Sequence, residues 1–206
     1  MDKEKIISTY NSIATDYEKA FSEPSLYISD FLKFLSPGDK ILDLGCGPGH
    51  NSIYLSSLGF EVVGVDLSDK MLELARNKNS KATFIKKDLS NLDFEENSFD
   101  HVIAAYSICY LPKDEVLSCL KNLSGIMKTS GIAFIKLQEG ASSEITVPEP
   151  FDEKLTIDLN VISFDEIKDL LSKSNFSIIK TYLDKKEVDE NFSELNELCI
   201  IVRNDK

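Results

Sequence analysis

The stretch from Ile41 to Ser52, "ILDLGCGPGHNS", combines an apolar run, three glycines on alternate positions and polar residues that enter a helical pattern. A strand that stops at glycines and continues into a helix leaves room for a ligand at the end of the strand. A dinucleotide-binding loop requires glycine or alanine where His50 stands, and a P-loop ends in Gly-Lys-Ser/Thr. This loop has neither feature and no basic residue, while Asp43 precedes it. The pattern favours a cofactor with a cationic part and no phosphate.

Apolar strand patterns alternate with helical patterns along the rest of the chain. The expected helices cover 51–58, 67–78, 113–127 and 163–175, and the expected strands cover 40–44, 60–66, 81–88, 99–107, 129–137, 176–183 and 196–204. Such alternation implies right-handed crossovers and a parallel sheet with helices on both faces. Residues 184–194 form a charged stretch without an apolar stripe, so the last two strands should pair antiparallel. The sequence therefore predicts an α/β fold with a seven-stranded, mostly parallel sheet and an antiparallel last strand.

The N-terminal part of the chain has a different pattern. Residues 2–20 carry apolar side chains at spacings of three and four, which predicts an amphipathic helix or helix pair, and Pro24 permits a second helix over 26–35. A length of 206 residues with 42% hydrophobic residues suits one domain. Its expected parts are an N-terminal helical cap (1–37), a cofactor-binding core (38–137), a lid insertion (138–160) and a C-terminal helix with a strand pair (161–206).

Composition excludes several classes of partner. The formal net charge is −12, which argues against nucleic acid and anionic membrane, because both are bound largely through Lys and Arg. The cysteines are scattered without metal-ligand spacing, so we expect free thiols, a reducing compartment and no metal site. No apolar leader opens the chain and no apolar run approaches membrane-spanning length, so the expected location is the cytoplasm.

Small or acidic residues stand at four successive strand ends. Asp66 ends the second strand about 20 residues past the glycines, where a carboxylate commonly takes two ribose hydroxyls. Asp88 ends the third strand and could accept a hydrogen bond from an adenine amino group. Ala104 and Ala105 end the fourth strand, where a ligand could approach the backbone. Each signal alone is weak, and Asp88 by itself is better explained as a turn residue. Their coincidence at the carboxyl ends of a parallel sheet predicts one site.

With these motifs in order, the sequence resembles the class I S-adenosylmethionine-dependent methyltransferases. "ILDLGCGPG", "VVGVDLSDKMLELAR" and "FIKKDLSNLDF" are similar to the first three motifs of that family, and "FDHVIAAYSICYL" and "LSGIMKTSGIAFI" to the motifs around the fourth and fifth strands. "YNSIATDYEKAF" resembles the first helix of small cytosolic members, including relatives of the quinone-biosynthesis C-methyltransferases. The resemblance implies a Rossmann-like fold, S-adenosyl-L-methionine as cofactor and a small organic methyl acceptor. Only 138–160 matches nothing specific.

The resemblance also implies roles for individual residues. Gly45, Cys46 and Gly47 would face the methionine part of the cofactor, with Asp43 just before them. Asp66 would hold the ribose, and the adenine would contact Leu67, Met71, Asp88 and Leu89. Ala104 and Ala105 would lie beside the sulfonium. Tyr17, and less directly Tyr10, would close the first helix over the cofactor, while Tyr10, Tyr106 and Tyr110 would meet the acceptor. Packing between helices explains Tyr10 and Tyr17 equally well, and core packing explains Met71.

The chemistry leaves the catalytic base unidentified. A phenol or carbon acid as acceptor needs a base, whereas a free amine or thiolate does not. His50 begins a helix and is better placed to orient a neighbour, and His101 lies early in a buried strand, where a structural role is expected. Quinone methylation is doubtful because no histidine stands near Tyr110, and the absence of Asn-Pro-Pro-Tyr after the fourth strand disfavours N6-adenine and glutamine methylation.

Two alternatives stay open at this point: a module that binds S-adenosylmethionine or S-adenosylhomocysteine without transferring methyl, and an NAD-linked oxidoreductase, which His50 disfavours. The long connection 138–160 contains the strand-like run "LTIDL" and two prolines. Connections at the carboxyl ends of strands commonly carry function. We expect it to fold with the N-terminal helices into a lid that excludes water from the sulfonium.

Overall fold

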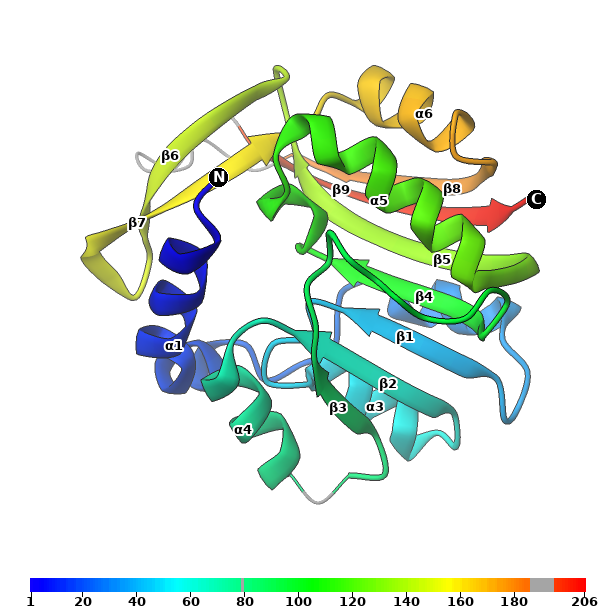
Figure 1. Ribbon diagram of the computed structural model, residues 1–206, viewed down its shortest axis with the longest axis horizontal. Helices are drawn as coiled ribbons and strands as arrows, with labels where there is room; N and C mark the ends of the chain where they lie inside the picture. Colours follow the sequence, from blue (N-terminus) through cyan, green and yellow to red (C-terminus); the bar gives the residue numbers. More distant parts are fainter. Residues whose placement is uncertain (79, 186–194) are drawn as a thin grey trace.

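The computed structural model describes residues 1–78, 80–185 and 195–206, and its centre is a seven-stranded sheet in the order β3-β2-β1-β4-β5-β9-β8 (Figure 1). The strands are β1 (Lys40–Leu44), β2 (Glu61–Asp66), β3 (Thr83–Lys86), β4 (Phe99–Ala105), β5 (Met127–Glu139), β8 (Phe176–Asp184) and β9 (Asn196–Asn204). Strand order reverses between β1 and β4, which is where open α/β sheets bind ligands.

The pairing of the strands confirms the predicted fold class. β1, β2, β3, β4 and β5 pair in parallel, whereas β9 runs antiparallel to both of its neighbours, β5 and β8. A seven-stranded sheet with an antiparallel last strand therefore follows as expected. Residues 186–194, where the sequence predicts a charged loop, lie outside the described residues.

Helices cover both faces of the sheet. They are α3 (His50–Ser57), α4 (Asp69–Asn77), α5 (Lys113–Ile126) and α6 (Phe164–Ser172). Side chains alternate along a strand, so Leu42 and Leu44 pack in the core cluster under α5 and α6, while Ile41 packs with Leu55 of α3 in the cluster on the other face. By the same alternation, the Asp43 side chain lies on the face of α3.

The N-terminal segment begins with the helix that the sequence predicts, and the second helix is shorter than predicted. Asp2 accepts hydrogen bonds from the amides of Glu4 and Lys5 and begins α1 (Lys3–Ala20). The helix predicted over 26–35 is only α2 (Ile28–Phe31) followed by the 3-10 turn η1 (Leu32–Phe34), and it begins at Tyr27 in a left-handed conformation (φ 68°).

Residues 138–160 contain a β-hairpin that sequence reasoning found only in half. "LTIDL" lies within β7 (Asp152–Val161), and its partner β6 (Ser143–Glu149) was not predicted. The two strands form a separate sheet beside α1 (Figure 1). A segment expected to be ordered is therefore a second small layer next to the main sheet.

Other expectations concern thiols and membranes. All four cysteines are buried and free, as predicted. Within the described ranges, no helix is long and apolar enough to cross a membrane.

Candidate functional site

A cavity of about 530 Å³ lies at the carboxyl ends of β1, β2, β4 and β5, under α1 and the hairpin. Small-molecule sites typically measure ~300–1,000 Å³. Figure 1 shows the arrowheads of β1 and β4 pointing toward α1. The predicted site residues that line the cavity are Tyr10, Tyr17, Gly45, Cys46, Gly47, Asp66, Leu67, Met71, Asp88, Leu89, Ala105, Tyr106 and Tyr110. Asp43 and Ala104 do not line it.

The glycine loop approaches a neighbouring turn on one side and open space on the other. Gly45 has φ 68°, and a Cβ there would lie 2.5 Å from the Cβ of Ser107. Gly47 has φ 53°, and no described atom lies within 4 Å of the position of its missing Cβ. Gly45 is therefore required by the protein's own packing, whereas Gly47 leaves space in a wall of the cavity.

Asp66 connects the glycine loop to the start of α4. Its Oδ2 accepts from the Gly47 amide at 2.8 Å and its Oδ1 accepts from the Ser68 amide at 2.8 Å. Burial raises the pKa of Asp66, although these amides oppose the shift. The carboxylate thus fixes the loop and keeps lone pairs for a ligand, since each carboxylate oxygen can accept more than one hydrogen bond.

Asp43 and Ala104 lie behind the cavity wall. The Asp43 carboxylate is 1% exposed, and its Oδ2 accepts from the Ser52 hydroxyl at 2.6 Å. Burial raises the pKa of Asp43 to about 6. Ala104 is 0% exposed, and its neighbour Ala105 lines the cavity instead. Strand alternation turns the Asp43 side chain toward α3 and the Ala104 side chain into the core, and their contacts with the cofactor stay predictions.

The wall formed by α1 is attached to the body by the buried side chains Ile13 and Ala14 and by a set of polar contacts. Lys3 Nζ lies 3.0 Å from Asp88 Oδ2, and Asn11 Oδ1 accepts from the Ser68 hydroxyl at 2.8 Å. The hydroxyls of Tyr10 and Tyr110 are hydrogen-bonded to each other, with ring centroids 5.6 Å apart. Further attachments are the ion pairs Lys5–Asp158 and Lys78–Glu18.

Tyr17 combines the two roles that the sequence left open. Its ring packs against Tyr10 on the same helix, at a centroid distance of 6.0 Å, and it also lines the cavity. Burial, followed by the nearby Asp66 carboxylate, raises the pKa of Tyr17 to about 12. Tyr17 is thus a neutral hydrogen-bonding group near Asp66. Met71, expected in the core, is 1% exposed and also lines the cavity.

Sequence reasoning missed a polar cluster beside Tyr106. Lys136 of β5 is buried, and its Nζ lies 3.0 Å from Glu197 Oε2 and 5.0 Å from the centre of the Tyr106 ring. Tyr106 has φ 55°, which is uncommon for a residue other than glycine, and its amide donates to the Lys136 carbonyl at 2.7 Å. Burial and the Glu197 carboxylate raise the pKa of Tyr106. Backbone strain of this kind is found at ligand sites.

The hairpin contributes a second set of residues that were not predicted. Glu149, Phe151, Ile157 and Leu159 line the cavity from β6, the hairpin turn and β7. Nothing in the local sequence marks them, because only the fold of the hairpin turns them toward α1.

Three buried polar atoms at the cavity have no partner among the described residues: His50 Nε2, Ser107 Oγ and Gln138 Oε1. Buried polar atoms are normally hydrogen-bonded, so such atoms are expected where a ligand or water supplies the partner. His50 Nε2 bonds to no described residue, and the role of His50 in orienting a neighbour stays a prediction. Burial lowers the pKa of His50, and the nearby Lys78 adds to the effect.

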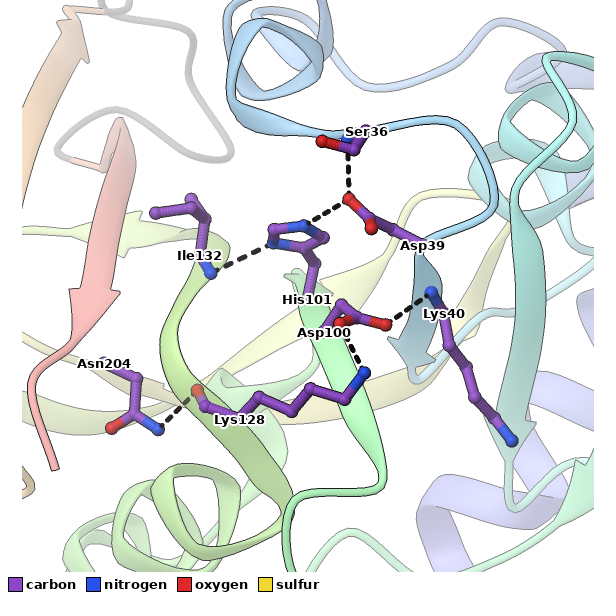
Figure 2. Close-up of polar contacts among 8 residues, drawn as sticks. All are labelled: Ser36, Asp39, Lys40, Asp100, His101, Lys128, Ile132 and Asn204. Carbon is purple, nitrogen blue, oxygen red and sulfur yellow. Dashed lines mark hydrogen bonds and ion pairs between the residues drawn. The ribbon is translucent and has the colours of Figure 1, made fainter.

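His101 lies at the opposite end of the sheet, in the network drawn in Figure 2. Its Nδ1 accepts from the Ile132 amide at 3.0 Å, and its Nε2 is 2.9 Å from Asp39 Oδ2. Because Nδ1 accepts the first hydrogen bond, Nε2 carries the proton and donates a hydrogen bond to Asp39 Oδ2. The structural role expected of His101 is confirmed.

Comparison with known proteins finds similarity to methyltransferases over part of the chain. Residues 41–131 match the family model described as "Methyltransferase domain". A demethylmenaquinone methyltransferase of Lactococcus lactis subsp. lactis is 32% identical over 146 residues, which are 64% of this chain and 57% of the relative. The chain spans about half the length of the curated relatives it matches.

Solved structures agree in fold. The Burkholderia thailandensis 1,6-didemethyltoxoflavin-N1-methyltransferase, with bound 1,6-didemethyltoxoflavin and S-adenosylhomocysteine, matches at a TM-score of 0.74 and 18% identity, over 98% of this chain and 88% of that chain. The [4+2]-cyclase SpnF matches at a TM-score of 0.75 and 12% identity, over 97% of this chain and 94% of that chain. Since a cyclase shares the fold, the activity has to be argued from the site.

Proposed function

We propose, on the premise that this chain carries a class I S-adenosylmethionine-dependent methyltransferase domain, that it transfers a methyl group from S-adenosylmethionine to a small organic acceptor. The observation that carries the proposal is one cavity with two kinds of wall. The glycine loop, Asp66 and Asp88 form one wall, and aromatic rings of α1 and the hairpin form the other.

The cofactor wall suits S-adenosylmethionine in charge and shape. Asp66 would hold the ribose hydroxyls, Asp88 would accept from the adenine amino group, and the space beside Gly47 would admit the methionine part. The cofactor supplies an electrophilic methyl group on a sulfonium. A loop without basic residues and an adjacent carboxylate favour that cation over a pyrophosphate.

The chain's own contribution to the reaction would be alignment and exclusion of water. α1 and the hairpin would cover the acceptor, and alignment of two reactants can contribute ~7–11 kcal/mol in favourable cases. The excess of acidic residues supports a small molecule over nucleic acid or membrane as acceptor, and four buried free thiols support a cytoplasmic location.

The test measures binding and transfer separately. Calorimetry should detect binding of S-adenosylhomocysteine and no binding of NAD. A donor-turnover assay over a metabolite library should find an acceptor. Replacing residues 143–161 by a short Gly-Ser turn should leave the affinity for S-adenosylhomocysteine within about threefold and abolish or broaden transfer. Binding without turnover on any acceptor would favour the non-transferring module instead. Unchanged activity and selectivity after truncation would refute the lid.

A further inference from the structure

Glu149 is a buried carboxylate that lines the cavity from the hairpin. The residue is 3% exposed and ends β6, where the hairpin turns. Its Oε2 accepts from the amides of Phe151 at 2.6 Å and Asp152 at 3.2 Å. These bonds fix the carboxylate at the turn. Burial raises the pKa of Glu149, and the two amides oppose that shift.

Within the described residues, Glu149 has no cationic partner. The other buried charges beside this part of the cavity compensate each other, because Lys136 is paired with Glu197 at 3.0 Å. Buried charges in proteins are paired or coordinated, since an isolated charge out of water is costly. A lone carboxylate that lines a cavity is therefore completed by a ligand.

Aromatic rings stand next to this carboxylate. Phe151 packs against Tyr17 and Phe21 of α1 at centroid distances of 6.0 and 5.8 Å, and Tyr17 packs against Tyr10 at 6.0 Å. All four residues line the cavity. Aromatic faces attract ammonium groups electrostatically, and the attraction increases where water is excluded.

We propose that the methyl acceptor carries a cationic nitrogen, and that Glu149 together with the rings of Tyr10, Tyr17 and Phe151 recognises it. The inference rests on the proposed function, because it takes this part of the cavity as the acceptor site. It concerns recognition of the cation and not the methylated atom: the carboxylate supplies the counter-charge and the rings supply faces that attract an ammonium group. Neutral and anionic molecules of the same shape are rejected because they leave Glu149 unpaired.

The experiment uses three probes with one skeleton and different charges: phenethylammonium, 2-phenylethanol and phenylacetate. Their affinities for the full chain are measured by NMR titration, with and without saturating S-adenosylhomocysteine. Phenethylammonium should bind at least tenfold more tightly than the other two. Glu149→Gln should remove that preference, and Phe151→Leu should weaken it several-fold. Glu153→Gln, at an exposed position of the same hairpin, should leave it unchanged.

Equal affinity for the three probes, no binding of any of them, or a preference that survives Glu149→Gln would overturn the inference. Loss of S-adenosylhomocysteine affinity in Glu149→Gln would do so too, because it would assign the carboxylate to the cofactor. If wild-type protein fails to bind S-adenosylhomocysteine, the proposed function fails instead, and the charge preference is still decided by the titration without it.

Discussion

The two ends of the parallel sheet carry the same kinds of residue in opposite states. At the amino end, His101 uses both ring nitrogens, with Ile132 and Asp39 as partners (Figure 2). At the carboxyl end, His50 Nε2 and Gln138 Oε1 are buried without a partner among the described residues. Ser98 Oγ, directly before β4, is also buried without a described partner, so the contrast holds for the two histidines and not for every polar atom.

The pKa directions of the carboxylates follow the same division. At the amino end, burial would raise the pKa of Asp100, but Lys128 and the Lys40 amide outweigh it and hold the pKa below its usual value. At the carboxyl end, burial dominates and raises the pKa of both Asp66 and Glu149. The division is not complete, because Asp88 at the carboxyl end pairs with Lys3 and its pKa is lowered, so the contrast holds for Asp66 and Glu149 against Asp100.

The largest expected effect is at Gly47. Gly47→Val should abolish detectable binding of S-adenosylhomocysteine in calorimetry, because a β-branched side chain would enter the cavity from a left-handed backbone position. The matched variant Gly45→Ala should lose stability instead, by about 1–3 kcal/mol, because its Cβ would collide with Ser107. Normal cofactor binding by Gly47→Val would show that the loop faces away from the ligand.

Asp66→Ala should have the next largest effect. A carboxylate contributes roughly 1.5–3 kcal/mol per charged hydrogen bond, so the loss of two ribose contacts should weaken the binding of S-adenosylhomocysteine by at least tenfold. The variant should still unfold in a cooperative melting transition. Asp69→Ala is the control, because Asp69 is exposed at the start of α4 and pairs with Lys86. Equal affinities of the two variants would rule out the ribose assignment.

Asp43→Asn tests the polar group behind the cavity through pH. The pKa of Asp43 is about 6 in the folded protein against an ordinary value of 3.8, so the folded state binds the extra proton between these values. The free energy of unfolding of the wild type therefore falls as pH rises from about 4 to about 6, because the buried Asp43 loses its proton. Asparagine carries no charge and can still accept from Ser52. The stability of the variant relative to wild type should rise through that window by about 3 kcal/mol, as measured by urea unfolding. A pH-independent difference would contradict the burial of Asp43.

The smallest effect compares the two histidines. His101→Ala should lower the free energy of unfolding by about 1–3 kcal/mol, because it removes the partner of the Ile132 amide and leaves Asp39 Oδ2 with only the Ser36 amide among the described residues, and should not change S-adenosylhomocysteine affinity. His50→Ala, which breaks no bond of Nε2 to a described residue, should leave stability nearly unchanged. Similar stability losses in both variants would remove the distinction between the two ends.

Sequence reasoning found the parts of the site that are encoded locally. The glycines and Asp66 follow a strand directly, so their position at the carboxyl edge is a consequence of the α/β alternation. Lys136 and Glu149 were missed because their surroundings are set by distant parts of the chain. Lys136 stands inside an apolar strand run, and its partner Glu197 belongs to β9, far along the chain. Glu149 lines the cavity only because the hairpin folds beside α1. Strand alternation places Asp43 on the same face as Ile41, so the sequence alone could have predicted that its side chain turns toward α3.

The attachment of α1 has a kinetic consequence. The helix that closes the cavity is held by contacts such as Lys3–Asp88, Lys5–Asp158 and Tyr10–Tyr110, and none of these is part of the sheet. Local opening draws on such weakly held elements and leaves the rest of a fold intact. We expect opening of α1 to break these polar contacts together with the packing of Ile13 and Ala14, and dissolved salt to weaken the ion pairs where they are exposed. Entry and exit of a bound molecule would then require local opening rather than global unfolding.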